Sequence, residues 1–440
     1  MVSGEWTGTM NLTEPQAGSD LAAVAARAVP EGDHYRISGQ KIFITWGDHR
    51  MTSNVIHLVL ARLPDAPFGV KGISLFLVPK YLLDANGEPA ERNDVQCVSL
   101  EHKLGIHASP TCVMAFGDKG GAIGYLVGEP HRGLAAMFTM MNAARQSVGL
   151  QGLSVSARSY RQALAWAKER LQGTRSDGSR YPIIEFPDVR RMLMLMKAGT
   201  EAMRALAFTA AAEIDRARLA RDPQQAARHH ARVELFTPIV KGWLTEMAQE
   251  LTSYGIQIHG GMGFVEETGS AQYYRDARIT TIYEGTTGIQ ANDLVGRKTL
   301  ANEGSVLADL LEDVRATARA LHAREGLAAL GATLQSGADS AQAASQWLLD
   351  NARNDRNVAG AAGVNFLMLL GYVCGGWLMG RSALKAAERL ESGGGDESFL
   401  QAKIVTARFY CEHLLPRAGA CLAAIQAGPD SMMALSADQF

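Results

Sequence analysis

The hydrophobic pattern of this chain changes its period once, near residue 133, and this change limits the folds that the chain can adopt. From residue 4 to about 130, apolar and polar residues alternate between turn residues, a pattern typical of strands. After residue 133, apolar residues recur at helical spacing. Strands followed by helices indicate an α+β fold. We therefore predict an antiparallel β domain at 1–133, an α-helical bundle domain at 134–300 and a further all-α C-terminal extension at 301–440.

Several individual elements are predicted from the same pattern. Residues 34–46 are typical of two strands around Ser38-Gly39. A helix is expected at 224–254, and Pro238 predicts a kink or a break in it. Further strands are expected at 54–63, 72–79, 95–100 and 111–116, and further helices at 134–172, 187–221, 307–325, 340–356, 357–391 and 399–427. The glycine run at 392–396 predicts a linker inside the extension.

One segment, 357–380, has the length of a membrane span. Its 24 residues carry no charge and lie between Arg356 and Arg381. However, the segment contains six glycines and two asparagines, and it lies among amphipathic helices. We therefore expect a buried helix or helix pair at a domain or subunit interface, and no transmembrane span.

The charge and cysteine content exclude some classes of function. Lysine and arginine number 43 against 45 acidic residues, so nothing in the charge favours a nucleic-acid partner. The five cysteines are scattered without metal-ligand spacing, and the pairs His102/His107 and His229/His230 lack a carboxylate or cysteine partner at ligand spacing, so we expect no metal site. Unpaired cysteines and the absence of a signal-peptide pattern predict a cytoplasmic protein. The glycine-rich runs at 117–124 and 260–263 lack the strand, helix and acidic residue of a dinucleotide-binding motif.

The segment 274–288 carries the strongest indication of chemistry. It reads Tyr-Arg-Asp-Ala-Arg-Ile-Thr-Thr-Ile-Tyr-Glu-Gly-Thr-Thr-Gly and places Glu284 just before a turn that begins a new helical pattern. Backbone N–H groups at a helix start can donate hydrogen bonds to an anionic oxygen or to the polar edge of a cofactor. The segment favours a carboxylate facing a cleft. The alternative is that Glu284 caps a helix or pairs with Arg278.

A second motif, Asn-Leu-Thr-Glu-Pro-Gln-Ala-Gly-Ser-Asp at 11–20, is a loop suited to touching a ligand. Pro15 excludes a central strand position, Gly18 lets the backbone come close, and Thr13 and Ser19 supply hydroxyl groups. Together with Ile-Tyr-Glu-Gly-Thr around Glu284, this motif resembles the acyl-CoA dehydrogenase family over residues 1 to about 300. The remaining tail is similar to the helical extension of a long bacterial subgroup, which includes enzymes acting on 3-methylmercaptopropionyl-CoA.

The resemblance implies an FAD-dependent enzyme that converts an acyl-CoA thioester to a trans-2-enoyl-CoA. Glu284 would be the catalytic base, and an electron-transfer flavoprotein would receive the electrons. A carboxylate suits this role if it is desolvated, because desolvation raises its proton affinity. The backbone N–H of Glu284 would help to hold the thioester oxygen.

The resemblance also implies which residues contact FAD and substrate. The cofactor contacts would be Met10, Leu12, Thr13, Ser19, Phe43, Ile44, Thr45, Arg170, Gln257, Gly261, Thr286 and Gly288. The substrate contacts would be Ser19, Asn142, Arg145 and Gly285, with Arg145 as a polar anchor for CoA. The alternative for Asn142 and Arg145 is a solvent-facing or interhelical pair. Since the family uses the residues that match Arg170, Gln257 and Gly261 across a subunit interface, we expect a homodimer or a higher homo-oligomer.

Two other functions stay open at this point. An acyl-CoA oxidase, which uses oxygen, would share these motifs. The family's N-terminal helical domain has no counterpart before the first predicted strand, and we therefore expect a truncated family member. The alternative to an enzyme is therefore a catalytically inactive chain that acts as an assembly partner.

Overall fold

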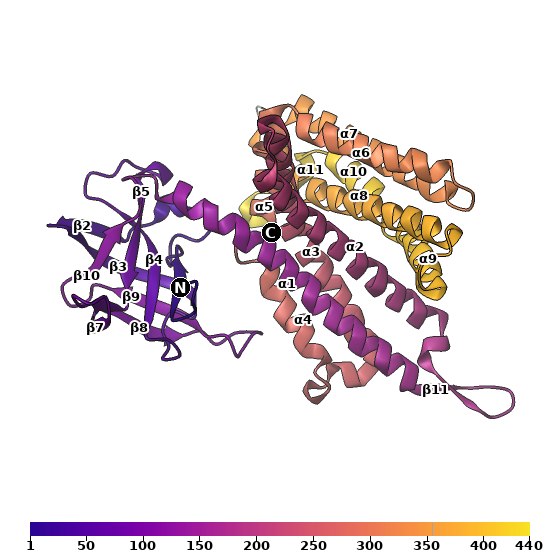
Figure 1. Ribbon diagram of the computed structural model, residues 1–440, viewed down its shortest axis with the longest axis horizontal. Coiled ribbons are helices and arrows are strands. Elements are labelled where there is room, and N and C mark those ends of the chain that lie inside the picture. Colours follow the sequence, from indigo (N-terminus) through magenta and orange to yellow (C-terminus); the bar gives the residue numbers. More distant parts are fainter. Residues whose placement is uncertain (354) are drawn as a thin grey trace. The chain divides into compact units, whose positions relative to one another are not determined.

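The computed structural model describes residues 1–353 and 355–440, which form two compact units, Met1–Ala143 and Ala144–Phe440 (Figure 1). The first unit is built mainly of strands and the second mainly of helices. The predicted α+β class is therefore confirmed. The three-part division at 133 and 300 stays a prediction.

The first unit is a single mixed sheet. Its strands are β1 (Trp6–Asn11), β2 (Arg27–Glu31), β3 (His34–Thr45), β4 (Asn54–Arg62), β5 (Ile73–Pro79), β8 (Val95–Leu100), β9 (Thr111–Phe116) and β10 (Ala122–Leu126). The order is β1-β4-β5-β10-β3-β9-β8, and β2 pairs with both β3 and β4, so β2, β3, β10, β5 and β4 form a closed ring. Most neighbours are antiparallel as predicted, but β1 runs parallel to β4. A small hairpin of β6 (Tyr81–Leu83) and β7 (Pro89–Arg92) lies outside this sheet.

The prediction of two strands at 34–46 is wrong, because β3 continues through Ser38-Gly39. Its first half pairs with β2 and β10, and its second half, from Gly39 onward, pairs with β9. Gly39 has φ +138°, and a Cβ there would lie 2.9 Å from the Cβ of Ala26. The glycine therefore lets one strand change partners instead of ending it.

The second unit contains long helices around one core. The helices are α1 (Gly133–Glu169, which begins in the first unit), α2 (Pro187–Leu219), α3 (Pro223–His259), α4 (Ser270–Arg278), α5 (Thr287–Gly296), α6 (Ser305–His322), α7 (Ala328–Asn351), α8 (Arg356–Glu391), α9 (Glu397–His413), α10 (Arg417–Gln426) and α11 (Asp430–Met433). A hairpin of β11 (Leu171–Thr174) and β12 (Arg180–Pro182) lies between α1 and α2. Helix α3 continues through Pro238, so the predicted break is absent. The helix predicted at 399–427 is two helices, because α9 ends before Pro416, which cannot donate a backbone hydrogen bond.

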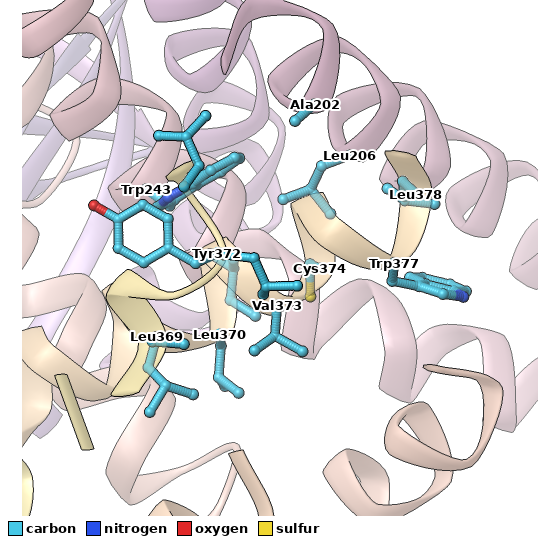
Figure 2. Packing of buried hydrophobic residues seen from close by; sticks show 14 of the residues in the cluster. Ala202, Leu206, Trp243, Leu369, Leu370, Tyr372, Val373, Cys374, Trp377 and Leu378 are labelled. Atoms are coloured by element: carbon cyan, nitrogen blue, oxygen red, sulfur yellow. The ribbon is translucent and has the colours of Figure 1, made fainter. Parts of the chain in front are cut away.

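Helix α8 packs against α2, α3 and α5, so the helices on both sides of residue 300 share one core. Trp243 of α3 meets Tyr372 of α8 edge to face, with ring centroids 6.1 Å apart (Figure 2). Helix α8 is long and apolar enough to cross a membrane, but 67% of its most apolar window is buried inside this unit. Burial by neighbouring helices accounts for its lack of charge.

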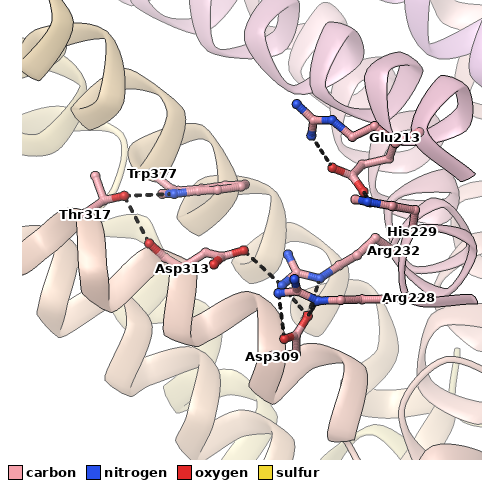
Figure 3. A network of polar contacts seen from close by, with 9 residues as sticks. Glu213, Arg228, His229, Arg232, Asp309, Asp313, Thr317 and Trp377 are labelled. Carbon is pink, nitrogen blue, oxygen red and sulfur yellow. Dashed lines mark hydrogen bonds and ion pairs between the residues drawn. The ribbon is translucent and has the colours of Figure 1, made fainter. Parts of the chain in front are cut away.

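Ion pairs join α6 to α3 at the edge of this core (Figure 3). The buried Arg232 of α3 donates from Nε to Asp309 Oδ2 at 2.8 Å and from Nη2 to Asp313 Oδ2 at 3.0 Å. Trp377 of α8 donates from Nε1 to Thr317 Oγ1 of α6 at 3.1 Å. Since Arg232 is only 5% exposed, loss of both Asp309 and Asp313 would leave an uncompensated charge in the interior.

The close contact between α3 and α8 depends on Gly371, which has no side chain. A Cβ on Gly371 would lie 2.1 Å from Cγ of Trp243, whereas a Cβ on Gly360 of the same helix would meet no atom of the described residues within 4 Å. We expect Gly371→Ala to lower the free energy of unfolding by about 1–3 kcal/mol through overpacking. Gly360→Ala should be neutral or stabilising by up to about 1 kcal/mol, because alanine favours helix. Thermal unfolding followed by circular dichroism would test the pair, and equal midpoints would contradict the packing argument.

Candidate active site

Glu284 lies in a tight turn between a 3₁₀ turn at Ile279–Thr281 and helix α5. Both Glu284 and Gly285 take the left-handed region, with φ of 55° and 89°. The side chain of Thr286 caps α5 by accepting a hydrogen bond from Ile289 N at 3.2 Å. A non-glycine residue held at positive φ is strained, so the surrounding contacts must hold this turn in place.

The buried side chain of Gln290 supplies these contacts. Its Nε2 donates to the carbonyl oxygens of Glu284 and Gly285 at 3.2 and 3.3 Å. Gln290 lies on the first turns of α5 and is 0% exposed. A Cβ on Gly285 would lie 2.6 Å from Gln290 Nε2, so the turn requires glycine at this position.

The Glu284 carboxyl group is largely withdrawn from water. Its Oε2 is buried and has no hydrogen-bond partner among the described residues. Burial raises the pKa of Glu284 above its ordinary value, and the positive charges of Arg145 and Lys241 oppose this rise. Burial dominates, so the carboxylate has a greater affinity for a proton than an exposed glutamate has.

Two alternatives for Glu284 do not occur in the described part of the chain. Thr286, not Glu284, caps α5, and Arg278 donates its hydrogen bond to Thr281 Oγ1. The nearest charged groups act on Glu284 from α1 and α3 instead. Among them, the buried Arg145 has its Nη1 3.6 Å from Asp293 Oδ2 of α5.

Arg145 and Asp293 form an interhelical pair, which was the alternative to a CoA contact. Asp293 also accepts from Arg297 Nε at 2.6 Å, so two cations share this carboxylate. Arg145 nevertheless acts electrostatically on Glu284, so it belongs to the same site. The substrate contacts of Ser19, Asn142, Arg145 and Gly285 stay predictions; Ser19 and Asn142 are exposed on the first unit.

The two segments predicted to contact FAD in the first unit lie side by side. Ile42 N donates to Thr13 O at 3.0 Å, and the buried Lys41 Nζ donates to Leu12 O at 3.1 Å. Phe43 sits at an irregularity in the β3–β9 register with φ 60°, and it is 60% exposed. The bulge thereby points an aromatic ring to the outside of the sheet, as a residue that lies along a flavin would require.

The predicted FAD contacts of the second unit form two groups. The Arg170 guanidinium lies 5.8 Å from the Trp166 ring centroid, and this ring stacks on His259 at 5.2 Å. Arg170 is therefore close to the end of α3, where Gln257 and Gly261 are exposed. Thr286 and Gly288 instead stand at the start of α5 beside Glu284.

Sequence reasoning missed three residues of the site: Lys241, Gln290 and Asp293. Gln290 and Asp293 are three residues apart on α5, shortly after Glu284, so they share one face of the helix, and this spacing could have indicated them. Lys241 lies 43 positions before Glu284 in a hydrophobic stretch of α3. A lone lysine inside an apolar helical run was the available signal.

Three family models match successive parts of the chain. They are described as "Acyl-CoA dehydrogenase, middle domain" at residues 9–118, "Acyl-CoA dehydrogenase, C-terminal domain" at 131–299 and "Acetyl-CoA dehydrogenase C-terminal like" at 310–436. The second model contains Glu284, Gln290 and Arg145. The third covers most of the predicted extension.

Similar proteins span almost the whole chain. The 3-methylmercaptopropionyl-CoA dehydrogenase of Ruegeria pomeroyi is 50% identical over 449 aligned residues, which cover 99% of this chain and 74% of the relative. A broad-specificity linear acyl-CoA dehydrogenase of Mycobacterium tuberculosis is 39% identical, with 93% and 70% covered. The solved Bacillus anthracis acyl-CoA dehydrogenase complexed with FAD has the same fold, with a TM-score of 0.73, 20% identity, and 98% of this chain and 70% of that chain covered.

Substitution of Gly285 tests whether Gln290 holds the turn at Glu284 in place. We expect Gly285→Ala to lower the thermal unfolding midpoint, because alanine at φ 89° costs about 1–2 kcal/mol and its Cβ would displace Gln290 Nε2. Gly296→Ala, at the other end of α5, is the matched control, since a Cβ there would meet no described atom within 4 Å. If both variants unfold at the same temperature, the clamp by Gln290 is wrong.

Proposed function

Because the chain belongs to the acyl-CoA dehydrogenase family, we propose that it catalyses α,β-dehydrogenation of an acyl-CoA thioester with Glu284 as the base. The observation that carries this proposal is the Glu284 carboxyl group, whose Oε2 is buried, in a turn held by Gln290. Membership confirms the predicted resemblance to the long bacterial subgroup. It also confirms the predicted class of an FAD-dependent oxidoreductase.

The environment of Glu284 suits removal of a proton from carbon. The acidity of an α-proton is low, so the accepting carboxylate must have a raised proton affinity, and burial supplies this. The positive charges of Arg145 and Lys241 limit the rise in the pKa of Glu284. Gln290 holds the backbone of the turn, so the position from which the Glu284 side chain extends is set before the proton is transferred.

The residues present fit FAD as the cofactor. The exposed Phe43 ring and the adjacent Leu12–Thr13 backbone offer an apolar face and polar atoms in the first unit. Arg170 offers a cation for a phosphate group in the second unit. When bound, FAD accepts the hydride that leaves the β-carbon. The chain's own residues bind the cofactor, orient the thioester and take the α-proton on the Glu284 carboxylate.

We propose a linear, saturated acyl-CoA as the substrate class. The similar proteins from Ruegeria pomeroyi and Mycobacterium tuberculosis are named for 3-methylmercaptopropionyl-CoA and for linear acyl-CoA. An electron-transfer flavoprotein is the proposed electron acceptor. The proposed location is the cytoplasm, since all five cysteines are free thiols.

Replacement of the base tests the reaction directly. We expect Glu284→Gln to keep bound FAD and to lose at least about 10²-fold in turnover, because the amide cannot accept the proton. Anaerobic reduction of a dye with butyryl-CoA or 3-methylmercaptopropionyl-CoA would measure this loss. Glu267→Gln, at an exposed position, should leave turnover unchanged. Undiminished activity of Glu284→Gln would refute the assignment, and peroxide release in air would identify an oxidase.

A subunit interface should contribute to FAD binding, since Arg170, Gln257 and Gly261 match residues that the family uses across a dimer. Dilution below the dimer dissociation constant should therefore release flavin, because the monomer lacks half of the site. Sedimentation velocity monitored through flavin absorbance would show free flavin appearing with the monomer. A monomer that retains one FAD per chain would contradict the shared site.

A further inference from the structure

We propose that Lys241 is a positioning residue for Glu284, whose buried ammonium group holds the Glu284 carboxylate ionised and ready to accept a proton. The role rests on the proposed function of Glu284 as the base. It assigns a task to a residue of α3 that has no part in the motifs of the sequence. Lys241 acts through Glu284 and needs no contact with substrate.

The position of Lys241 withdraws its charge from water. Every residue from 235 to 245 in α3 is buried, and Lys241 is 0% exposed. Its Nζ is buried and has no hydrogen-bond partner among the described residues. A buried ammonium group without a partner destabilises a fold, and a methionine of similar volume would avoid this cost. The stability of the core therefore gives no reason for a lysine here.

Three charged groups act on Lys241, and they come from different elements. They are Glu246 on the same helix, Glu284 in the turn before α5, and Arg145 on α1. Glu246 acts on Lys241 most strongly, and it also accepts a hydrogen bond from Thr287 Oγ1, which leaves its negative charge in place. Glu284 is the one whose carboxyl oxygen, Oε2, is buried without a partner in the described chain. The buried ammonium of Lys241 and the partly buried Glu284 carboxyl group are therefore oppositely charged groups that act on each other.

Arg145 is the other cation that acts on Glu284, but its charge is shared. Its guanidinium pairs with Asp293, whose carboxylate also accepts from Arg297. Lys241 forms no ion pair within 4 Å in the part of the chain that the structure describes. Both cations act on Glu284, Arg145 more strongly than Lys241, and Glu246 partly balances the charge of Lys241.

The direction of the effect follows from the charges. A nearby cation favours the ionised form of a carboxyl group, so loss of Lys241 should raise the pKa of Glu284 further. Burial lowers the pKa of Lys241 itself to about 8, so the lysine stays mostly charged at neutral pH and loses its charge at alkaline pH. The base works only when ionised, so its rate falls as pH falls through the pKa of Glu284. Loss of Lys241 should move this acid limb to higher pH.

The test compares Lys241→Met with Lys241→Arg and with Lys403→Met, a control that removes a partly exposed lysine paired with Glu201. The carboxyl group of Glu284 would be titrated by difference infrared spectroscopy of the full chain, with Glu284→Gln to assign the band. In parallel, the pH profile of dye reduction by butyryl-CoA would be recorded for each variant.

We expect Lys241→Met to raise the titration midpoint of Glu284 by about one unit, the lower end of the effect of one nearby opposite charge. Turnover should fall about tenfold at pH values below the midpoint and recover at higher pH. Lys241→Arg should restore both readouts, and Lys403→Met should change neither. Thermal stability of Lys241→Met should be equal or higher. If Lys241→Met does not fold, the same titration and turnover measurements on Lys241→Gln test the role of Lys241.

An unchanged Glu284 titration in Lys241→Met would overturn the role of Lys241. An equal loss of turnover at every pH would do the same, because it indicates a structural defect. A shifted titration in a chain whose wild type reduces no dye would leave the role of Lys241 in place and reject the proposed reaction. The infrared readout therefore separates failure of this inference from failure of the proposed function.

Discussion

Helix α3 is buried on every side over 235–245, and this burial links the core of the helical unit to its candidate site. Trp243 fills the space above Gly371 of α8, while Lys241, two residues earlier, acts on Glu284. Successive positions of a fully buried helix face different neighbours, because each residue turns by about 100°. The packing of α8 against α3 therefore also determines where the charge of Lys241 lies.

The turn at Glu284 shows how a site can be held rigid at a local energetic cost. A positive φ at Glu284 is unfavourable for an isolated chain, because only glycine adopts it without strain. Gln290 compensates with two hydrogen bonds to the carbonyl oxygens of Glu284 and Gly285, and its burial keeps water from competing for these bonds. The backbone of the turn is therefore held in place, and burial raises the proton affinity of the Glu284 carboxyl group, a property that proton abstraction from carbon requires.

The helices after residue 300 belong to the same core as the site. Helix α8 covers α3 and α5, and the pairs of Arg232 with Asp309 and Asp313 tie α6 to α3. None of these later helices carries a predicted site residue. Their contribution is the exclusion of water from α3, and this exclusion strengthens every electrostatic interaction near Glu284. The extension thus supports the candidate site without taking part in its chemistry.

The sequence by itself determined the α+β class, most strands and helices, and the candidate base, because hydrophobic period and turn residues act locally. It failed where a choice depended on neighbours: β3 passes through Gly39 by exchanging β2 and β10 for β9, and α3 does not break at Pro238. Only the tertiary structure brought Lys241 and Gln290 to Glu284 and paired Arg145 with Asp293. Such partners are chosen by the packing of separate helices, and spacing along the chain carries no record of that packing.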